Sequence, residues 1–266
     1  MLAKNAVLSM WLTYLKSLKV NPALLEPFLT CAPKASTVIT GIQQHLYNSI
    51  ILQNPTDNSR LIEELYTVQK NLDLPLTVWL SSDTDSAGFE DILKKNFDSP
   101  GPFYGMVLEV ARATLLAHSP KITIEPVKNL QQAEEYAQLF CKVFHFPSLL
   151  NPTIDWAVAQ YENSKPSGLS YIARVDGIAA GVSSLMFDDE FEGCKAGGLY
   201  NACVLPEFRK MGVGTAMASH RIKVAQEMGL EYISILLMSD AMARGYCERL
   251  GFVHQSTLTP FYISSC

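Results

Sequence analysis

A short segment between a predicted strand and a predicted helix has the residue types of an anion site. Residues 204–216 read V-L-P-E-F-R-K-M-G-V-G-T-A. Pro206 cannot donate to a sheet and so ends the strand-like run 198–205, and an amphipathic helix begins near Gly212. The backbone N–H groups from Arg209 to Gly214 can then face one anion together with the positive end of the helix dipole.

The glycines of this segment would let a diphosphate approach the main chain. Gly212 and Gly214 have no Cβ atom, and Arg209 and Lys210 add positive charge. The segment is not a Walker loop, because no Gly-Lys-Ser/Thr follows four spacer residues, and it lacks the third glycine of the Rossmann fingerprint. Two glycines before a helix also occur in ordinary tight turns, so the flanking residues must decide.

The order V-x-P-x-x-R-x-x-G-x-G over residues 204–214 resembles the acetyl-CoA pyrophosphate loop of the GNAT superfamily of N-acyltransferases. The elements that follow agree with that family: a helix over 215–228, a buried strand over 232–238, and a short helix that ends at Leu250-Gly251-Phe252 before a last strand. The resemblance covers roughly residues 121–266. It implies acetyl-CoA as cosubstrate, held by Cys203, Val204, Leu205, Arg209, Lys210, Met211, Gly212, Val213, Gly214, Thr215, Asp240 and Tyr246.

The resemblance also implies where the groups for acyl transfer lie. The donor to the oxyanion is a backbone N–H at the end of the central strand, here that of Val204 or Leu205. The acid that protonates the departing thiolate is usually a tyrosine four residues before the glycine of Leu-Gly-Phe. That position is Cys247 in this chain, and Tyr246 stands one residue earlier. Both residues are therefore candidates for the acid, while a small core residue is the simpler interpretation of Cys247.

The general base is not identified by the sequence. Glu190, Glu192, His145 and His254 are candidates, and each is also explained as a surface or packing residue. Residues 188–192 form a charged loop, which is most simply a solvated hairpin turn but is also able to attract a cationic amine. An Asp-Gly pair at 176–177 between two strand-like runs predicts a hairpin with a type I′ turn.

The first half of the chain has an order of predicted elements similar to that of the second half. A helix over 3–19 is followed by predicted strands and helices in the order β, β, α, β, α, β. These segments contain no Arg-x-x-Gly-x-Gly turn. We therefore expect an α+β protein with two GNAT-like domains, each a mixed, mostly antiparallel sheet flanked by helices. Residues 1–118 would be a degenerate domain without a coenzyme site, and 119–266 the acetyl-CoA-binding catalytic domain. An unrelated α+β domain in the first half is the alternative.

Composition limits the partners of the protein. The formal net charge of −5 over 266 residues gives no broad basic surface, which argues against nucleic acid as a partner. The cysteines, Cys31, Cys141, Cys194, Cys203, Cys247 and Cys266, have neither metal-ligand spacing nor a disulfide pattern. We therefore expect no metal, free thiols and a reducing cytoplasm. No stretch reaches the about 20 apolar residues of a membrane span.

These observations predict a cytoplasmic N-acetyltransferase that moves an acetyl or other acyl group from acetyl-CoA to a primary amine. In this family the surface that binds the acceptor is built from variable loops, so the sequence does not identify the acceptor. The sequence also leaves the oligomeric state open. A non-catalytic CoA-binding regulatory or interaction protein is the main alternative, because of the displaced tyrosine and the first half without a loop. A nucleotide-phosphate binder that uses the same loop would respond to ATP at least as strongly as to CoA.

Overall fold

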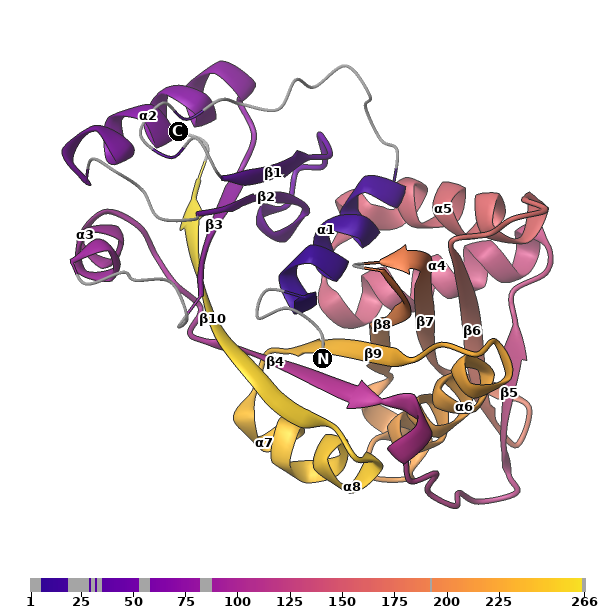
Figure 1. Ribbon diagram of the computed structural model, residues 1–266. Helices are drawn as coiled ribbons and strands as arrows, with labels where there is room; N and C mark the ends of the chain where they lie inside the picture. Colours follow the sequence, from indigo (N-terminus) through magenta and orange to yellow (C-terminus); the bar gives the residue numbers. More distant parts are fainter. Residues whose placement is uncertain are drawn as a thin grey trace.

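The strands of the protein form one continuous mixed sheet (Figure 1). The computed structural model describes residues 6–18, 29, 32, 35–52, 58–81, 88–191 and 193–264. Within these residues the sheet has ten strands in the order β1-β2-β3-β10-β4-β9-β8-β7-β6-β5. Their bounds are β1 Ser36–Ile39, β2 Asn48–Ile51, β3 Leu76–Ser81, β4 Phe103–Glu109, β5 Ile122–Pro126, β6 Gly168–Val175, β7 Ile178–Phe191, β8 Cys194–Val204, β9 Tyr232–Leu237 and β10 Val253–Ile263.

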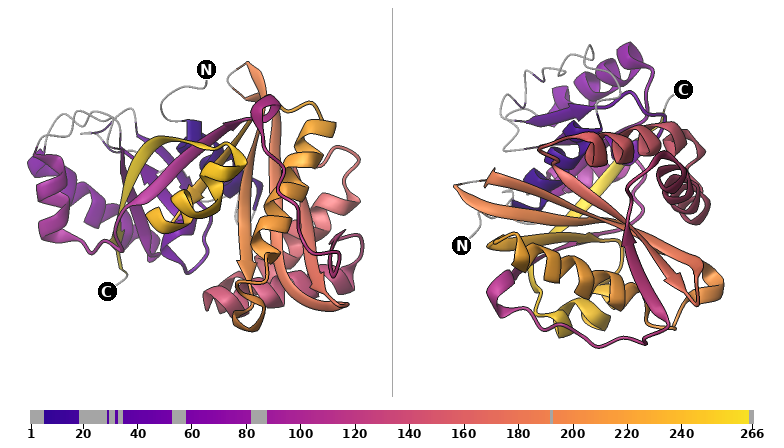
Figure 2. Two further views of the ribbon diagram at one scale, coloured as in Figure 1. Left: turned by 90° about the horizontal axis from the view of Figure 1, so that it is seen from below. Right: turned by 90° about the vertical axis from the view of Figure 1, so that its right-hand side faces the viewer.

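Helices cover both faces of the sheet formed by β5 to β9 (Figure 2). On one face α4 and α5 pack together, and α6 lies on the other, where Ala218, Ile222 and Ala225 are buried. The α-helices are α1 Ala6–Ser17, α2 Asn58–Leu72, α3 Phe89–Asn96, α4 Leu130–Phe144, α5 Leu150–Glu162, α6 Val213–Glu227, α7 Asp240–Met242 and α8 Glu248–Leu250. Short 3-10 helices are η1 His45–Tyr47, η2 Val110–Arg112, η3 Pro147–Leu149 and η4 Pro206–Phe208.

Two strands join the halves of the chain. β4 belongs to the first 118 residues, yet it pairs antiparallel with β9 on one side and with β10 on the other. β10 closes the chain and also pairs antiparallel with β3. Each half therefore contributes a strand that is hydrogen-bonded to strands of the other half. In addition, α1 packs against β1, β4, β8 and β9.

The predicted fold class is confirmed, with one difference in the arrangement of the strands. The helices and strands expected from periodicity are present, and Asp176 and Gly177 have φ values of 48° and 84°, as the predicted type I′ turn requires. The sequence predicted one sheet for each domain, whereas the structure has a single sheet. The pairing of strands from the two halves depends on contacts between residues far apart in the sequence. Hydrophobic periodicity gives no information about such contacts. The division at residue 118 stays a prediction.

The packing of β4 between its neighbours generates a prediction about Gly105. A Cβ atom at Gly105 would lie 2.7 Å from Ser256 Oγ and 3.2 Å from a methyl group of Val7. We expect Gly105→Ala to lower the free energy of unfolding by about 1–3 kcal/mol, as overpacking does in tight cores. Denaturant unfolding would measure this loss. Gly245→Ala is the control, since an added Cβ there meets nothing within 4 Å; equal midpoints for the two variants would contradict the prediction.

Candidate functional site

The site begins where two neighbouring parallel strands part. β8 pairs with β9 from Ala196 and Tyr232 to Leu199 and Ile235. In the part of the chain that the structure describes, this pairing ends there, although β8 continues to Val204 and β9 to Leu237. The ends of the two strands are therefore free of each other and leave room between them.

A β-bulge on β8 accompanies this parting. The pairing with β7 runs Val182↔Cys203 and then Ser184↔Tyr200, so β8 holds one residue more than β7 in this interval. Asn201 has φ 54°, in the left-handed region that only Gly, Asn and Asp visit readily. A bulge bends its strand and increases the local twist, which here turns the end of β8 away from β9.

The buried side chain of Arg221 on α6 binds the carbonyl groups beside the bulge. Its Nη1 donates to Ser184 O at 2.8 Å and to Tyr200 O at 3.4 Å, and its Nε donates to Met217 O at 3.2 Å. Burial lowers the pKa of the guanidinium to about 10, so it stays a cation at neutral pH. The side chain therefore replaces sheet hydrogen bonds that the bulge interrupts.

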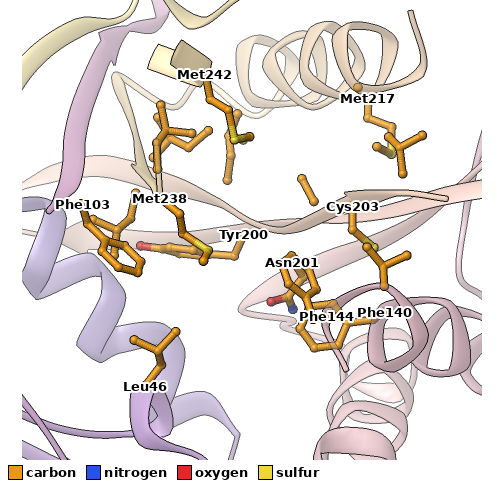
Figure 3. A pocket seen from close by; sticks show the side chains of 18 of the residues that line it. Leu46, Phe103, Phe140, Phe144, Tyr200, Asn201, Cys203, Met217, Met238 and Met242 are labelled. Carbon is orange, nitrogen blue, oxygen red and sulfur yellow. The ribbon is translucent and has the colours of Figure 1, made fainter. Parts of the chain in front are cut away.

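A pocket of about 450 Å³ occupies the space between the parted strands. Figure 3 shows Met217 and Met242 on one side of the strands and Leu46, Phe140 and Phe144 on the other. The pocket therefore passes through the sheet. One end of it opens beside the amino terminus of α6, where Arg209 and Gly214 line it.

The loop before α6 has the geometry of an anion cradle. Gly212 precedes the helix with φ 85°, and the first intrahelical bond runs from Ala216 N to Gly212 O. The N–H groups of Val213, Gly214 and Thr215 come before that bond and have no partner within the helix. The predicted cradle from Arg209 onward needs one correction: Arg209 N donates to Pro206 O at 3.2 Å, so that amide is already used.

The end of β8 distinguishes the two candidate oxyanion donors. Leu205 N donates to Ala180 O at 2.9 Å, so Leu205 is excluded as a free donor and this part of the prediction is wrong. Successive residues of a strand direct their N–H groups to opposite edges. The N–H of Val204 therefore faces the edge from which β9 has parted. Its carbonyl accepts from Arg209 Nε at 3.3 Å.

The two candidate acids lie in different environments. Tyr246 lines the pocket, whereas Cys247 has 0% exposure and packs in the core with Leu250 and Phe252. Both belong to a π-helical turn, Ala243–Cys247. A π-turn takes one residue more than an α-turn, which accounts for a tyrosine that faces the pocket from one position earlier. Burial raises the pKa of the Cys247 thiol to about 11 and also raises that of the Tyr246 phenol.

The other predicted coenzyme residues are spread around the loop. Cys203, Val204, Arg209, Gly214 and Tyr246 line the pocket. Lys210, Met211 and Gly212 are exposed on the loop, and the side chains of Leu205 and Val213 are buried. Thr215 and Asp240 are partly buried and do not line the pocket. Their contacts with the coenzyme stay predictions.

The candidate general bases are not brought together at the pocket. His145 and His254 are exposed and do not line it. Glu192 and the side chain of Glu190 lie outside the described residues, as do Cys31 and Cys266. The described residues contain no group of three or more His, Cys, Asp or Glu side chains placed to hold a metal ion.

Sequence reasoning missed the pocket wall that comes from the first half of the chain. Trp11, Leu46, Tyr47, Trp79 and Phe103 line the pocket together with residues of the second half. Apolar side chains are typical of a protein core, and only the pairing of strands from the two halves brings these residues to the site. Arg221 was also missed, although an arginine among the apolar residues of a helical stripe was an available signal.

Comparisons with known proteins agree with this geometry. Residues 130–252 match the Acetyltransferase (GNAT) family. A GCN5-related N-acetyltransferase from Kribbella flavida superposes with a TM-score of 0.67 at 14% identity, over 96% of this chain and 95% of that one. A functionally unknown conserved protein from Staphylococcus epidermidis superposes with a TM-score of 0.69 at 15% identity, over 94% and 96%. At these identities the likeness shows the fold alone. No curated protein matched the sequence.

The contacts of Arg221 predict a large effect on stability. Arg221→Met keeps the length of the aliphatic side chain but leaves buried carbonyls without donors, which costs about 1–3 kcal/mol each. We expect a loss of about 2–4 kcal/mol in the free energy of unfolding, measured in denaturant. Lys223→Met on the same helix is the control, because Lys223 is exposed and its ion pair with Glu227 is 4.0 Å long. A loss for Arg221→Met no larger than that of the control would contradict the role assigned to Arg221.

Proposed function

We propose, from the premise that residues 130–252 carry an acetyltransferase domain of the GNAT family, that the protein transfers an acyl group from acetyl-CoA to a primary amine. The observation that carries the proposal is the pocket between β8 and β9, which opens beside the amino terminus of α6. A thioester bound there would have its diphosphate at the helix and its acyl group at the parted strands.

The loop supports the binding of the diphosphate. A Cβ atom built at Gly212 meets nothing within 4 Å, and one built at Gly214 meets only Val204 Cγ2 at 4.0 Å. The backbone is thus open toward a ligand on this side, and the N–H groups of Val213, Gly214 and Thr215 point along the helix axis out of its amino terminus. Lys210 and Arg209 supply positive charge at the same place.

Two groups of this chain support the chemistry. The amine nitrogen attacks the thioester carbon, the carbon–sulfur bond breaks, and the amine loses a proton to water. The N–H of Val204 would stabilise the negative charge that develops on the carbonyl oxygen. The hydroxyl of Tyr246 would give its proton to the departing thiolate and would recover a proton from the water that received one from the amine. Cys247 is a less suitable donor, because it is fully buried among apolar side chains.

The protonation state of Tyr246 suits an acid. Desolvation raises the pKa of its phenol, and the nearby Arg221 only partly opposes that shift. A raised pKa keeps the proton in place as the pH rises, so Tyr246 stays a donor through the neutral and mildly alkaline range. The fall in kcat from its deprotonation would therefore lie above about pH 10, the ordinary value of a tyrosine.

The remaining parts of the proposal concern the first half and the compartment. Residues 1–118 supply no Arg-x-x-Gly-x-Gly turn, and we place the single coenzyme site in residues 119–266. Among the described residues, Cys141, Cys203 and Cys247 are free thiols, which a reducing cytoplasm maintains. In the described part of the chain no helix has the length and apolar character needed to cross a bilayer.

Substitution of Gly214 tests the coenzyme loop. Glutamate in the first turn of α6 is favourable for the helix dipole, so Gly214→Glu should fold at least as well as the wild type. It would place a side chain and a negative charge where the diphosphate binds. We expect acetyl-CoA at a hundredfold excess over its dissociation constant to stabilise the wild type by about 2.7 kcal/mol and this variant by nothing measurable.

Thermal unfolding with and without acetyl-CoA measures the stabilisation of the wild type and of Gly214→Glu by the ligand. Thr215→Ala is the matched control, because it retains the backbone N–H and adds no charge, and it should keep most of the shift. Equal shifts in the wild type and in Gly214→Glu would disprove the loop assignment. Stabilisation by ATP as large as by CoA would support a nucleotide-phosphate binder instead.

Substitutions at Tyr246 and Cys247 test the acid. Tyr246→Phe removes only a hydroxyl, so we expect CoA binding to persist and kcat to fall by about 10²–10⁴-fold, the range for lost acid catalysis. Cys247→Ala should change kcat little. Release of free thiol from acetyl-CoA with a panel of amines measures kcat. A larger loss in Cys247→Ala than in Tyr246→Phe would transfer the role to Cys247, and no effect of either would assign the proton to water.

A further inference from the structure

The part of the pocket remote from the coenzyme loop has an aromatic and aliphatic wall. Trp11 of α1, Leu46 of η1, Trp79 of β3, Phe103 of β4, and Phe140 and Phe144 of α4 line it. Trp79 and Phe103 meet edge to face with ring centroids 5.4 Å apart, and the rings of Phe140 and Phe144 are 5.0 Å apart. Five separate elements therefore converge to make one apolar surface beside the reacting end.

The pocket takes the end of the coenzyme beside α6 and also extends to this wall on the other side of the strands. At about 450 Å³ it falls in the range of pockets that enclose drug-sized ligands, about 300–1,000 Å³. An acetyl group adds a single methyl beyond the thioester carbonyl. A bulkier apolar group would bury against this wall and gain about fourfold in affinity for each methylene removed from water.

The charges around the pocket do not favour a cationic occupant. Arg209 is the charged side chain among its described lining residues, and it is positive. An ammonium group that moves into apolar surroundings loses hydration, and desolvation lowers the pKa of an amine. An amine that enters this pocket would therefore lose its proton readily, which produces the neutral nucleophile that attack on a thioester requires.

We propose that this wall binds a bulky apolar group next to the amide bond that the protein forms, carried either by the acyl group or by the acceptor amine. This inference rests on the proposed acyl transfer. It narrows the substrates to those with an apolar chain or ring on one reactant. Small hydrophilic amines with acetyl-CoA would then be poor substrates.

Two isomeric products distinguish which reactant carries the group. Acetyl-CoA with hexylamine gives N-hexylacetamide, and hexanoyl-CoA with ethylamine gives N-ethylhexanamide, while acetyl-CoA with ethylamine is the reference. We expect kcat/KM to exceed the reference by at least about tenfold in one of the two reactions, and the reaction that responds identifies the carrier. Values no higher than the reference in both reactions would overturn the inference while leaving acyl transfer intact.

Variants of α4 test whether the apolar wall causes the preference for a six-carbon substrate. Phe144→Gln should reduce the advantage of the six-carbon substrate by about tenfold or more, and Phe144→Leu should keep most of it. Lys142→Gln is the matched control, since Lys142 is exposed on the same helix and does not line the pocket. An equal loss in Phe144→Gln and Lys142→Gln would overturn the assignment of the wall.

A binding measurement decides the question without turnover. With CoA present, one of the two isomers, N-hexylacetamide or N-ethylhexanamide, should raise the thermal midpoint more than N-ethylacetamide at the same concentration, and Phe144→Gln should remove the difference. Equal midpoints with all three amides in the wild type would overturn the inference. A midpoint unchanged by CoA alone would instead count against the proposed function, so the two failures are distinguishable.

Discussion

The parting of β8 from β9 is the constraint on which the site depends. Two neighbouring strands inside a sheet normally hydrogen-bond along their length, and a buried carbonyl without a partner costs about 1–3 kcal/mol. The bulge at Asn201 turns β8 away, and Arg221 donates to the carbonyls of Ser184 and Tyr200 beside it. A guanidinium suits this position because its several donors diverge in one plane and reach more than one acceptor. The space between the strands is therefore held open by hydrogen bonds that replace those of the sheet.

The first half of the chain takes part in the same arrangement. Asn201 Nδ2 donates to the hydroxyl of Tyr14 on α1 at 2.9 Å, and the ring of Tyr14 stacks on that of Tyr200 with centroids 5.1 Å apart. Burial raises the pKa of the Tyr14 hydroxyl to about 12, so the phenol stays neutral in this contact. α1 thus supports the bulge from the face opposite α6. The first half therefore supports the bulge and also contributes the strand β4 to the sheet.

Local sequence patterns predicted most of the helices and strands, but they did not predict the contacts between residues far apart in the sequence. The helix predicted over 215–228 and the turn at Asp176 follow from periodicity and turn chemistry, which act over a few residues. The pairing of β4 with β9 joins residues more than a hundred positions apart, and no local signal encodes it. The loop before α6 was recognisable because its proline, arginine and glycines each have a local conformational role. The sequence did not show which amides of the loop are free. The amide of Arg209 is used by the 3-10 turn over Pro206–Phe208, which the sequence pattern does not reveal.

The position of Tyr246 illustrates how a helix can bring to a pocket a residue one position away from the one that a sequence pattern indicates. The resemblance puts the acid four residues before Gly251, at Cys247, whereas the side chain that lines the pocket is that of Tyr246, in a π-turn over 243–247. One inserted residue in a helix rotates everything before it by about 100°, and a π-turn absorbs that residue locally. The thiol then faces the core with Leu250, and the phenol faces the pocket. In an apolar, water-poor pocket a few oriented dipoles act at low dielectric, where they are stronger than in water. The N–H of Val204, the amino terminus of α6 and the phenol of Tyr246 are the polar groups that the proposed reaction would use, and the apolar lining of the pocket would strengthen their effect.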